Sequence, residues 1–257
     1  MSTTVGHAPN LQALMQSNGL NIDGWDAPIY RVFSLRWFKD MITQRRNGLV
    51  RPSKWDDPFE NFFLKCNVQT ASGELGSLKP IHDGWYGQCW TMHRDSDAMW
   101  RIYSHDKGAI RVSTTIRQLF AAVCDTTDEY ARLEYFIGVV EYKERAEIER
   151  FIKDISFMDL AYGGQADKFA HTLCIKRLEF SHEKEVRLLI QDLNHTHSDV
   201  LNVPFDYEAV LNDAVCDPRL EPSEFERVKN ELVGLGCTLP ITQSDLYKIE
   251  EMTIRLA

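Results

Sequence analysis

The sequence of 257 residues contains no apolar run of the roughly 18 residues that a membrane-spanning helix needs. Its first residues show neither the basic start nor the apolar stretch of a secretory signal, so we expect a cytoplasmic protein without a membrane partner. It has no Gly-x-Gly-x-x-Gly motif and no Walker-type phosphate loop, which excludes those two ways of cradling a nucleotide. Without repeats, low-complexity tracts or a linker rich in proline, glycine and serine, the chain is expected to form one domain over residues 1–257.

The six cysteines are scattered, and no two of them stand at a Cys-x-x-Cys spacing. We expect buried, reduced thiols rather than disulfides or zinc ligands. One close histidine pair, His195 and His197, lies in the polar stretch from Asp192 to Asp199, and no further ligands stand at a metal-binding spacing from it. The sequence therefore predicts a surface loop there and no metal site.

Hydrophobic residues make up 44% of the chain, which is enough for a sizeable core, and the net charge of −9 argues against permanent binding to nucleic acid. The charge is uneven. Seven basic residues and one acid lie between Tyr30 and Trp55, whereas eight acids and three bases lie between Asp206 and Glu231. Solvated helix faces explain part of both stretches, and the basic segment 31–54 is also a candidate surface for a nucleic-acid or protein acceptor.

Hydrophobic periodicity predicts short strands with helices inserted between them, which indicates an α+β fold rather than regular βαβ winding. Helices are expected over residues 9–20, 97–104, 143–162 and 165–176. Three more are expected from their N-terminal caps: one after Ser34, with Arg45 and Arg46 in its last turn, one after Ser113-Thr114-Thr115, and one after a capping box at Ser223. Strands are expected over residues 30–33, 49–51, 86–92, 108–112, 135–142, 200–205, 209–216 and 238–242. Within the single domain, residues 1–27 are assigned to an N-terminal helical extension and 143–176 to a helical insert.

The stretch from Phe180 to Ile190 predicts a strand that opens with two carboxylates. Because side chains alternate along a strand, Glu183, Glu185 and Arg187 are expected to share one face, while the apolar residues between and after them anchor the other face in the core. Two carboxyl groups one strand repeat apart are typical of sites that break the bond to a sugar's anomeric carbon. A merely solvated strand start is the plain alternative.

A series of short motifs resembles a bacterial family, the domain of unknown function 2971. The resemblance covers most of residues 28–248 and is carried by Tyr30-Arg31, Asp57-Pro58-Phe59-Glu60, Cys89-Trp90-Thr91, Met99-Trp100-Arg101-Ile102-Tyr103, Gly108-Ala109-Ile110, Lys176-Arg177, Glu183-x-Glu185-Val186-Arg187, Asp217-Pro218-Arg219 and Ser244. That family in turn resembles the ADP-ribosyltransferase superfamily, which includes toxins that modify DNA and RNA. The resemblance implies an ADP-ribosyltransferase-like α+β fold, with a split mixed or antiparallel sheet and inserted helices, that grips NAD as its substrate.

For catalysis, the resemblance implies that Glu185 is the acid that opens the late strand. Glu183 gives the pair the spacing of a two-glutamate motif in which the earlier acid faces the acceptor. This chemistry suits the residues, because NAD carries its own leaving group and a carboxylate stabilises the positive charge that develops on the ribose. Groups of this kind are typically worth ~3–4 kcal/mol of transition-state stabilisation.

For NAD binding, the resemblance implies that Arg31 holds the ribose or pyrophosphate, with Tyr30 beside it. Trp100 and Tyr103 are candidates to stack on nicotinamide, and Ser113 loosely matches a serine of the middle motif. Each residue also has a plainer interpretation. Arg31 fits a strand-end salt bridge, the two aromatics fit a core, and Ser113 fits a helix cap.

The leading hypothesis is an NAD-consuming ADP-ribosyltransferase or NAD glycohydrolase. It would be a bacterial toxin or anti-phage defence effector that acts on nucleic acid or protein, with a cognate antitoxin or defence-system protein as a partner. The alternative is a non-catalytic sensor module with the same fold that binds a nucleotide or a phage component. A metal-dependent nuclease built on Glu183 and Glu185 is a third hypothesis, although the acid-x-Lys spacing that favours such sites is missing.

Overall fold

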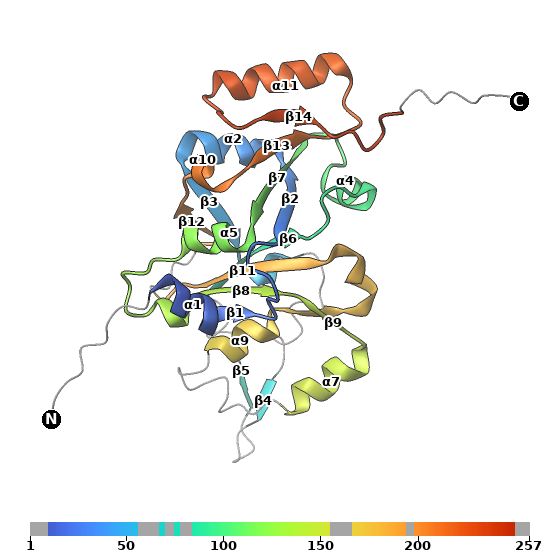
Figure 1. Cartoon of the computed structure of the whole chain (residues 1–257). Coiled ribbons are helices and arrows are strands. Elements are labelled where there is room, and N and C mark those ends of the chain that lie inside the picture. The colour runs from blue at the N-terminus through green and yellow to red at the C-terminus, as the bar shows by residue number, and fades with distance from the viewer. Residues whose placement is uncertain are drawn as a thin grey trace, which may run out of the picture.

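A mixed ten-stranded sheet runs through the molecule, with helices on its faces and ends (Figure 1). The computed structural model describes residues 10–55, 67–69, 75–77, 84–154, 166–193 and 198–249. The strands of the large sheet are β1 (Gly19–Leu20), β2 (Pro28–Ser34), β3 (Arg46–Val50), β6 (Trp85–Thr91), β7 (Ala109–Thr115), β8 (Tyr135–Val139), β11 (Glu185–Gln191), β12 (Val200–Pro204), β13 (Asp213–Cys216) and β14 (Ile241–Gln243). Two small sheets pair β9 (Glu141–Lys143) with β10 (Ile175–Arg177) and β4 (Asn67–Gln69) with β5 (Leu75–Ser77).

The large sheet splits at β6. One edge of β6 pairs with β11 along its whole length, whereas the other edge meets two different strands, β2 at Thr91 and β3 at Gly87. One branch then continues from β2 through β7 and β13 to β14, and the other from β3 to β12. The β1–β8 and β13–β14 pairs are parallel and the others antiparallel. The expected α+β class with a split mixed sheet is confirmed.

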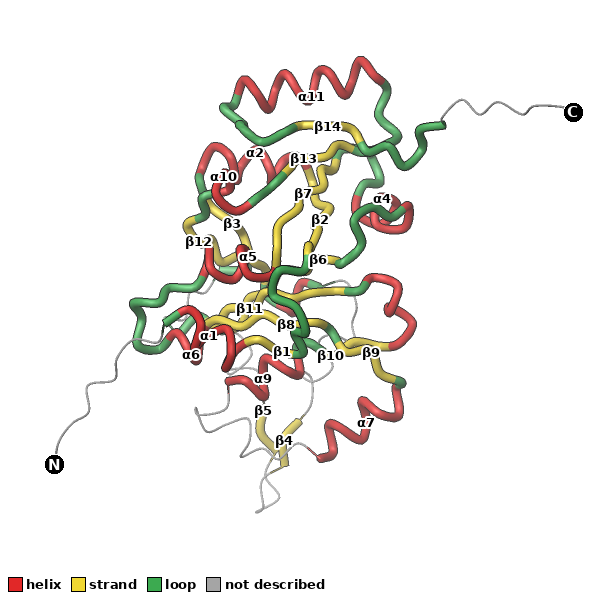
Figure 2. Tube along the Cα trace, viewed as in Figure 1, coloured by secondary structure: helices red, strands yellow, loops and turns green. Residues whose placement is uncertain are grey.

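Helices occupy both ends of the molecule and flank the sheet (Figure 2). They are α1 (Leu11–Asn18), α2 (Leu35–Gln44), α4 (Asp97–Tyr103), α5 (Ile116–Val123), α6 (Ala131–Glu134), α7 (Arg145–Asp154), α9 (Ala166–Thr172), α10 (Tyr207–Val210) and α11 (Pro222–Gly234), with 3₁₀ turns η1 (Pro52–Lys54) and η3 (Leu178–Glu183). Among the helices described, none is long and apolar enough to cross a membrane. The α11 helix packs against β14 at one end of the molecule, and α7 and α9 pack against β10 and β8 near the other end.

The hydrophobic core explains why β11 lies in the middle of the sheet. Its residues Val186, Leu188 and Ile190 are buried in the main core, as the alternation of the sequence predicts. On the opposite face Leu189 joins a second, smaller core with Trp85 of β6. A strand with apolar neighbours on both faces is fixed in place, so its first residue, at the start of β11, is held rigidly as well.

Local signals explain several helix boundaries and correct others. Ser34 caps α2 as expected, but the helix ends at Gln44 because Arg45 adopts a left-handed conformation with φ of 51°, so Arg46 starts β3 instead of completing the last turn. Thr115, and not Ser113, caps α5 through a capping box.

Two further expectations about helix and strand boundaries fail, and a third segment is described only in part. The capping box at Ser223 is wrong, because α11 begins with Pro222 at its first position, where the fixed φ of proline favours a helix start. Residues 207–210 form α10, so β13 is shorter than predicted. The segment 143–176 contains α7 and α9 but also reaches into the β9–β10 sheet, and residues 155–165 lie outside the described residues, as do His195 and His197.

Candidate active site

The two glutamates meet on a buried lysine. Lys176 Nζ donates to Glu183 Oε2 at 2.7 Å and to Glu185 Oε1 at 2.6 Å. The second oxygen of Glu185, Oε2, accepts from Arg187 Nε at 2.7 Å. Glu183 is 6% exposed and Glu185 4%, so the alternative of a solvated strand start is wrong. We call these four residues the acidic-pair cluster.

Three elements position this cluster. Lys176 lies on β10, and Glu185 and Arg187 point to the same face of β11. Glu183 is the last residue of η3 rather than a strand residue, and Lys184 follows it with a φ of 43°. The prediction that Glu183 and Glu185 share the face of one strand is therefore wrong in its backbone geometry, although the left-handed turn at Lys184 still brings both carboxyl groups to one lysine.

The surroundings hold the cluster firmly. The guanidinium of Arg187 lies 4.4 Å from the centroid of the Trp55 ring and donates to the carbonyl oxygen of Leu173 at 2.7 Å. The backbone N–H of Glu185 donates to the hydroxyl of Tyr142 at 2.9 Å. Buried charges require this density of partners, because a buried ion without them loses its hydration without replacement.

The cluster drives the pKa values of the two acids apart. Burial raises the pKa of Glu183, and the hydrogen bond and charge of Glu185 raise it further, so that it lies well above its usual range. Burial also opposes ionisation of Glu185, but Arg187 and Lys176 outweigh it and hold the pKa of Glu185 well below its usual range. One carboxyl thus stays ionised while its neighbour retains a proton far more readily, which is the division of roles that acid–base chemistry on a sugar bond uses.

A row of polar residues crosses the sheet from the cluster. Glu185 is paired with Thr91, Thr91 with Tyr30, Tyr30 with Ser113, and Ser113 with Asp213. Residues paired directly across strands point to the same face. The row joins three of the predicted residues on five adjacent strands. Ser113 Oγ donates to Asp213 at 2.6 Å, so this serine serves a strand contact rather than a helix cap.

Arg31 does not share that face. Alternation along β2 places it opposite Tyr30, and its guanidinium lies 4.6 Å from the centroid of the Phe33 ring. Burial lowers the pKa of Arg31 to about 10, and the charges of Cys89 and Tyr103 act in the other direction. Within the described part of the chain its side chain forms neither an ion pair nor a hydrogen bond, so the strand-end salt bridge is not found and Arg31 does not contact Glu185 directly.

The two aromatic candidates on α4 differ. Trp100 is 1% exposed, and its indole N–H donates to Asp95 at 2.5 Å, so a packing role replaces the predicted stacking on nicotinamide. Tyr103 is 45% exposed. Burial of its phenol, followed by the charge of Glu183, raises its pKa, with smaller contributions from Cys89 and Glu185. Its helix, α4, packs against β2, the strand that carries Tyr30 and Arg31.

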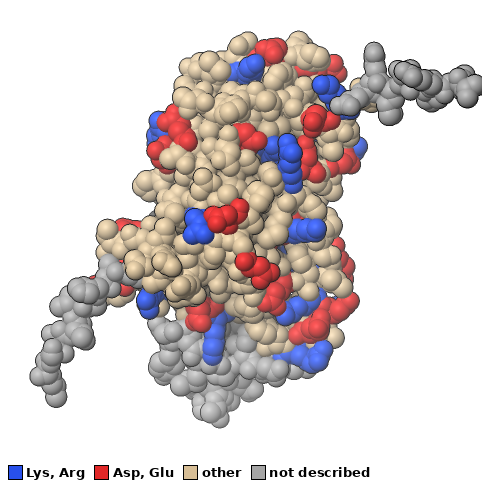
Figure 3. Space-filling model, viewed as in Figure 1, with Lys and Arg blue, Asp and Glu red and all other residues tan. Residues whose placement is uncertain are grey.

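The basic segment 31–54 is largely neutralised by acids from elsewhere in the chain. Lys39 pairs with Glu231, and Arg45 pairs with Asp206 and Glu208 of the acidic stretch. Others pair with acids outside that stretch: Arg46 with Asp40, and Lys54 with Asp199. On the face shown in Figure 3, acidic and basic side chains are interspersed. Four of the seven basic residues thus have acidic partners, so the segment is less basic than its local charge count suggests, and its role as an acceptor surface stays a prediction.

Sequence reasoning missed the residue that organises the site. Lys176 was recognised only as part of a motif, and the signal for its role was its position in the same series of motifs as the two glutamates. Arg111 was also missed. Its guanidinium lies 5.3 Å from the centroid of the Tyr30 ring and pairs with Asp213 at 3.2 Å, at the far end of the polar row. Among the described residues, no group of three or more His, Cys, Asp or Glu side chains is arranged to hold a metal ion.

Comparison with known proteins finds one family and a group of solved structures. Residues 99–188 match the family described as "Protein of unknown function (DUF2971)". No curated protein matches the chain significantly. The chain is similar to Thermus sp. 2.9 DarT in complex with ADP-ribosylated ssDNA at 10% identity and a TM-score of 0.40, over 88% of this chain and 97% of that one.

The same Thermus sp. 2.9 protein in complex with NAD+ gives 11% identity and a TM-score of 0.39, over 86% of this chain and 96% of that one. The similarity thus extends over most of the chain at low identity. Since both TM-scores lie below 0.5, it describes the general course of the chain and carries no statement about activity.

Proposed function

We propose that this chain, whose residues 99–188 match the DUF2971 family model, is an NAD-consuming ADP-ribosyltransferase or NAD glycohydrolase. One observation carries the proposal. A buried carboxylate, Glu185, lies beside a carboxyl of raised pKa, Glu183, and both share Lys176 at the start of a rigidly held strand. This pair supplies the two groups that cleavage at an anomeric carbon requires.

The chemistry follows from the charges. When nicotinamide leaves NAD, positive charge develops on the ribose, and the carboxylate of Glu185 stabilises it without having to reorganise. A carboxylate offers about four acceptor positions, and Lys176, Arg187 and Glu183 take three of them, which leaves one for a ribose hydroxyl. In its ionised form Glu183 is the more basic of the two acids, because of its raised pKa, and can take the proton of an attacking water or acceptor group and pass it to solvent.

Binding of NAD is assigned to residues beside the pair. Arg31 is a desolvated cation for which the described residues provide no counter-ion, and a pyrophosphate would supply the missing negative charge through bidentate hydrogen bonds. Tyr30 lies in the same row as Glu185, and Tyr103 offers a partly exposed ring on α4, the helix that packs against β2. Ser113 lies on β7, one strand beyond Tyr30 in the same row, and would contact NAD from there.

As a biological role we propose a toxin or anti-phage effector that transfers ADP-ribose to nucleic acid or protein, restrained by a cognate antitoxin or another defence protein. NAD and single-stranded DNA are the ligands named for the Thermus sp. 2.9 structures. The basic segment 31–54 is the proposed acceptor surface, with part of its charge compensated by acids of the chain.

The direct test is release of nicotinamide from NAD by the purified protein, measured by chromatography. Glu185→Gln is expected to lower turnover on the order of a hundredfold or more, because it removes the negative charge that opposes the developing cation. Glu226→Gln, on the exposed face of α11, is the matched control and should behave as wild type. Full activity of Glu185→Gln, or no nicotinamide from wild type with cell extract as a source of acceptor, would contradict the proposal.

A non-catalytic binding module is the second candidate, and one observation favours it. Both oxygens of Glu185 hold buried cations, as they do in purely structural ion-pair networks. Isothermal titration calorimetry with NAD separates the two candidates. A binding module would keep NAD affinity in Glu185→Gln and show no turnover in wild type, whereas an enzyme would lose turnover only in the variant.

A further inference from the structure

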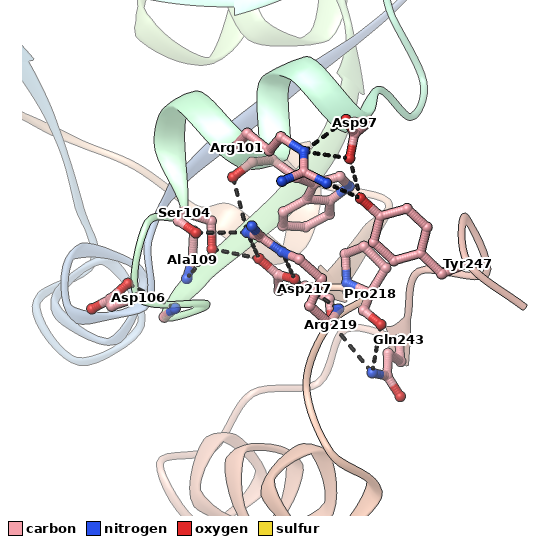
Figure 4. Close-up of polar contacts among 12 residues, drawn as sticks. Asp97, Arg101, Ser104, Asp106, Ala109, Asp217, Pro218, Arg219, Gln243 and Tyr247 are labelled. Atoms are coloured by element: carbon pink, nitrogen blue, oxygen red, sulfur yellow. Dashed lines mark hydrogen bonds and ion pairs between the residues drawn. The ribbon is translucent and has the colours of Figure 1, made fainter.

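The short helix α4 is held at its C-terminus by an ion pair from another part of the chain (Figure 4). Arg219 Nη2 donates to the carbonyl oxygens of Trp100 at 3.1 Å and Ser104 at 2.6 Å. Asp217, which is fully buried, accepts from Ser104 Oγ at 2.6 Å. The same two carbonyl oxygens accept from the backbone N–H groups of Ser104 and Lys107, so Arg219 adds a second donor to each and joins the end of α4 to the turn at Asp217.

The geometry of this pair depends on a guanidinium. Asp217 Oδ1 accepts from the backbone N–H and the Nε of Arg219 at 2.8 and 2.9 Å, and Oδ2 accepts from Nη2 at 2.6 Å. Gln243 fixes the same turn from β14, donating to the carbonyl oxygen of Leu220 at 2.8 Å. Lysine has a single nitrogen and cannot reach both carboxylate oxygens and two carbonyls at once.

The other end of α4 is tied down as well. Asp97 accepts from the hydroxyl of Tyr247 and from Arg101 Nε, as Figure 4 shows. A helix of this length is marginal without tertiary contacts, so these contacts decide where it lies.

Tyr103 is the last residue of α4, directly before Ser104 and its contact with Asp217. The helix packs against β2, which carries Tyr30 and Arg31. We infer that the Asp217–Arg219 pair is a positioning element that fixes the end of α4 and thereby holds Tyr103 against β2, the strand that carries Tyr30 and Arg31. This inference rests on the proposed function for its consequence in catalysis, but not for its geometry.

The test uses Arg219→Lys in the full-length protein, with Arg227→Lys as the matched control, because Arg227 forms an exposed ion pair with Glu224 on α11. Site-specific 3-fluorotyrosine at position 103 reports the surroundings of the phenol by fluorine NMR. Arg219→Lys is expected to change the fluorine shift and to move the titration of the phenol towards that of the free amino acid. Turnover of NAD should fall by roughly 10- to 100-fold, as expected for misplacement of a binding group by about 1 Å.

Tyr247→Phe removes one hydroxyl contact at the opposite end of α4 and provides a second variant if Arg219→Lys folds poorly. It should shift the same fluorine signal by a smaller amount. An unchanged fluorine titration in a folded Arg219→Lys protein would overturn the inference, even if wild type consumes NAD. Conversely, if Arg219→Lys alters the fluorine titration but the wild-type protein does not turn over NAD, the positioning role is supported and the proposed function is contradicted.

Discussion

Lys176→Met is the sharpest test of how the acidic-pair cluster is stabilised. Methionine keeps an unbranched apolar stem and removes only the ammonium group, which donates to Glu183 and Glu185 at 2.7 and 2.6 Å. All three side chains are less than a tenth exposed, so water cannot replace the lost donor. Removing one partner of a buried ion pair typically costs ~3–5 kcal/mol.

This cost translates into a large shift in melting temperature. For a chain of this size, 1 kcal/mol corresponds to roughly 2–4 °C, so the variant is expected to melt ~6–20 °C below wild type. Urea unfolding followed by tryptophan fluorescence gives the free energy of unfolding, and Lys229→Met on α11 controls for the substitution itself. The double variant Lys176→Met with Glu183→Gln should recover at least half of the loss, because it removes the acid that has lost its cation, while Glu185 keeps its ion pair with Arg187.

The destabilisation caused by Lys176→Met must also depend on pH. Without Lys176 the folded-state pKa of Glu183 rises further above its unfolded value. A group with a raised folded-state pKa contributes stability that is complete below the unfolded pKa and is lost as the pH rises through the folded pKa. The destabilisation should therefore be smaller at about pH 5 than at about pH 8. A cost below about 1 kcal/mol, or an equal cost at both pH values, would refute the account of the cluster as a buried ion-pair network.

Three further predictions address the fold and the pair. Leu188→Ala removes a fully buried side chain from the main core and should lower the free energy of unfolding by ~2–5 kcal/mol in urea titrations, and a smaller loss would mean that the core collapses around the site. Gly87→Ala places a Cβ 2.5 Å from the Trp55 ring and 3.1 Å from Leu189. We therefore expect the free energy of unfolding to fall by ~1–3 kcal/mol and the tryptophan fluorescence to change, and wild-type values of both would contradict the close packing there. The raised pKa of Glu183 means that wild type loses stability as the pH rises through that pKa, and Glu183→Gln should flatten this part of the stability profile measured by calorimetry.

The sequence by itself determined the class of the fold and most of its elements. Periodicity predicts α1, α2 and α5 and the buried face of β11, because 3.6-residue and two-residue repeats depend only on which residues must leave water. It also singled out Glu183 and Glu185. Boundaries that depend on one residue's conformation were less accurate, as the ends of α2 and the start of α11 show.

Only the tertiary structure decided which charges meet. The basic and acidic stretches are far apart in the sequence, yet Lys39–Glu231 and Arg45–Asp206 neutralise much of both, so local charge counts misjudged the surface. Likewise, the pairing of β9 with β10 brings Lys176 beneath the acidic pair, and the pairing of β2 with β6 places Tyr30, rather than Arg31, in the row of Glu185. Electrostatic partners are selected by distance in space, and no repeat along the chain encodes that distance.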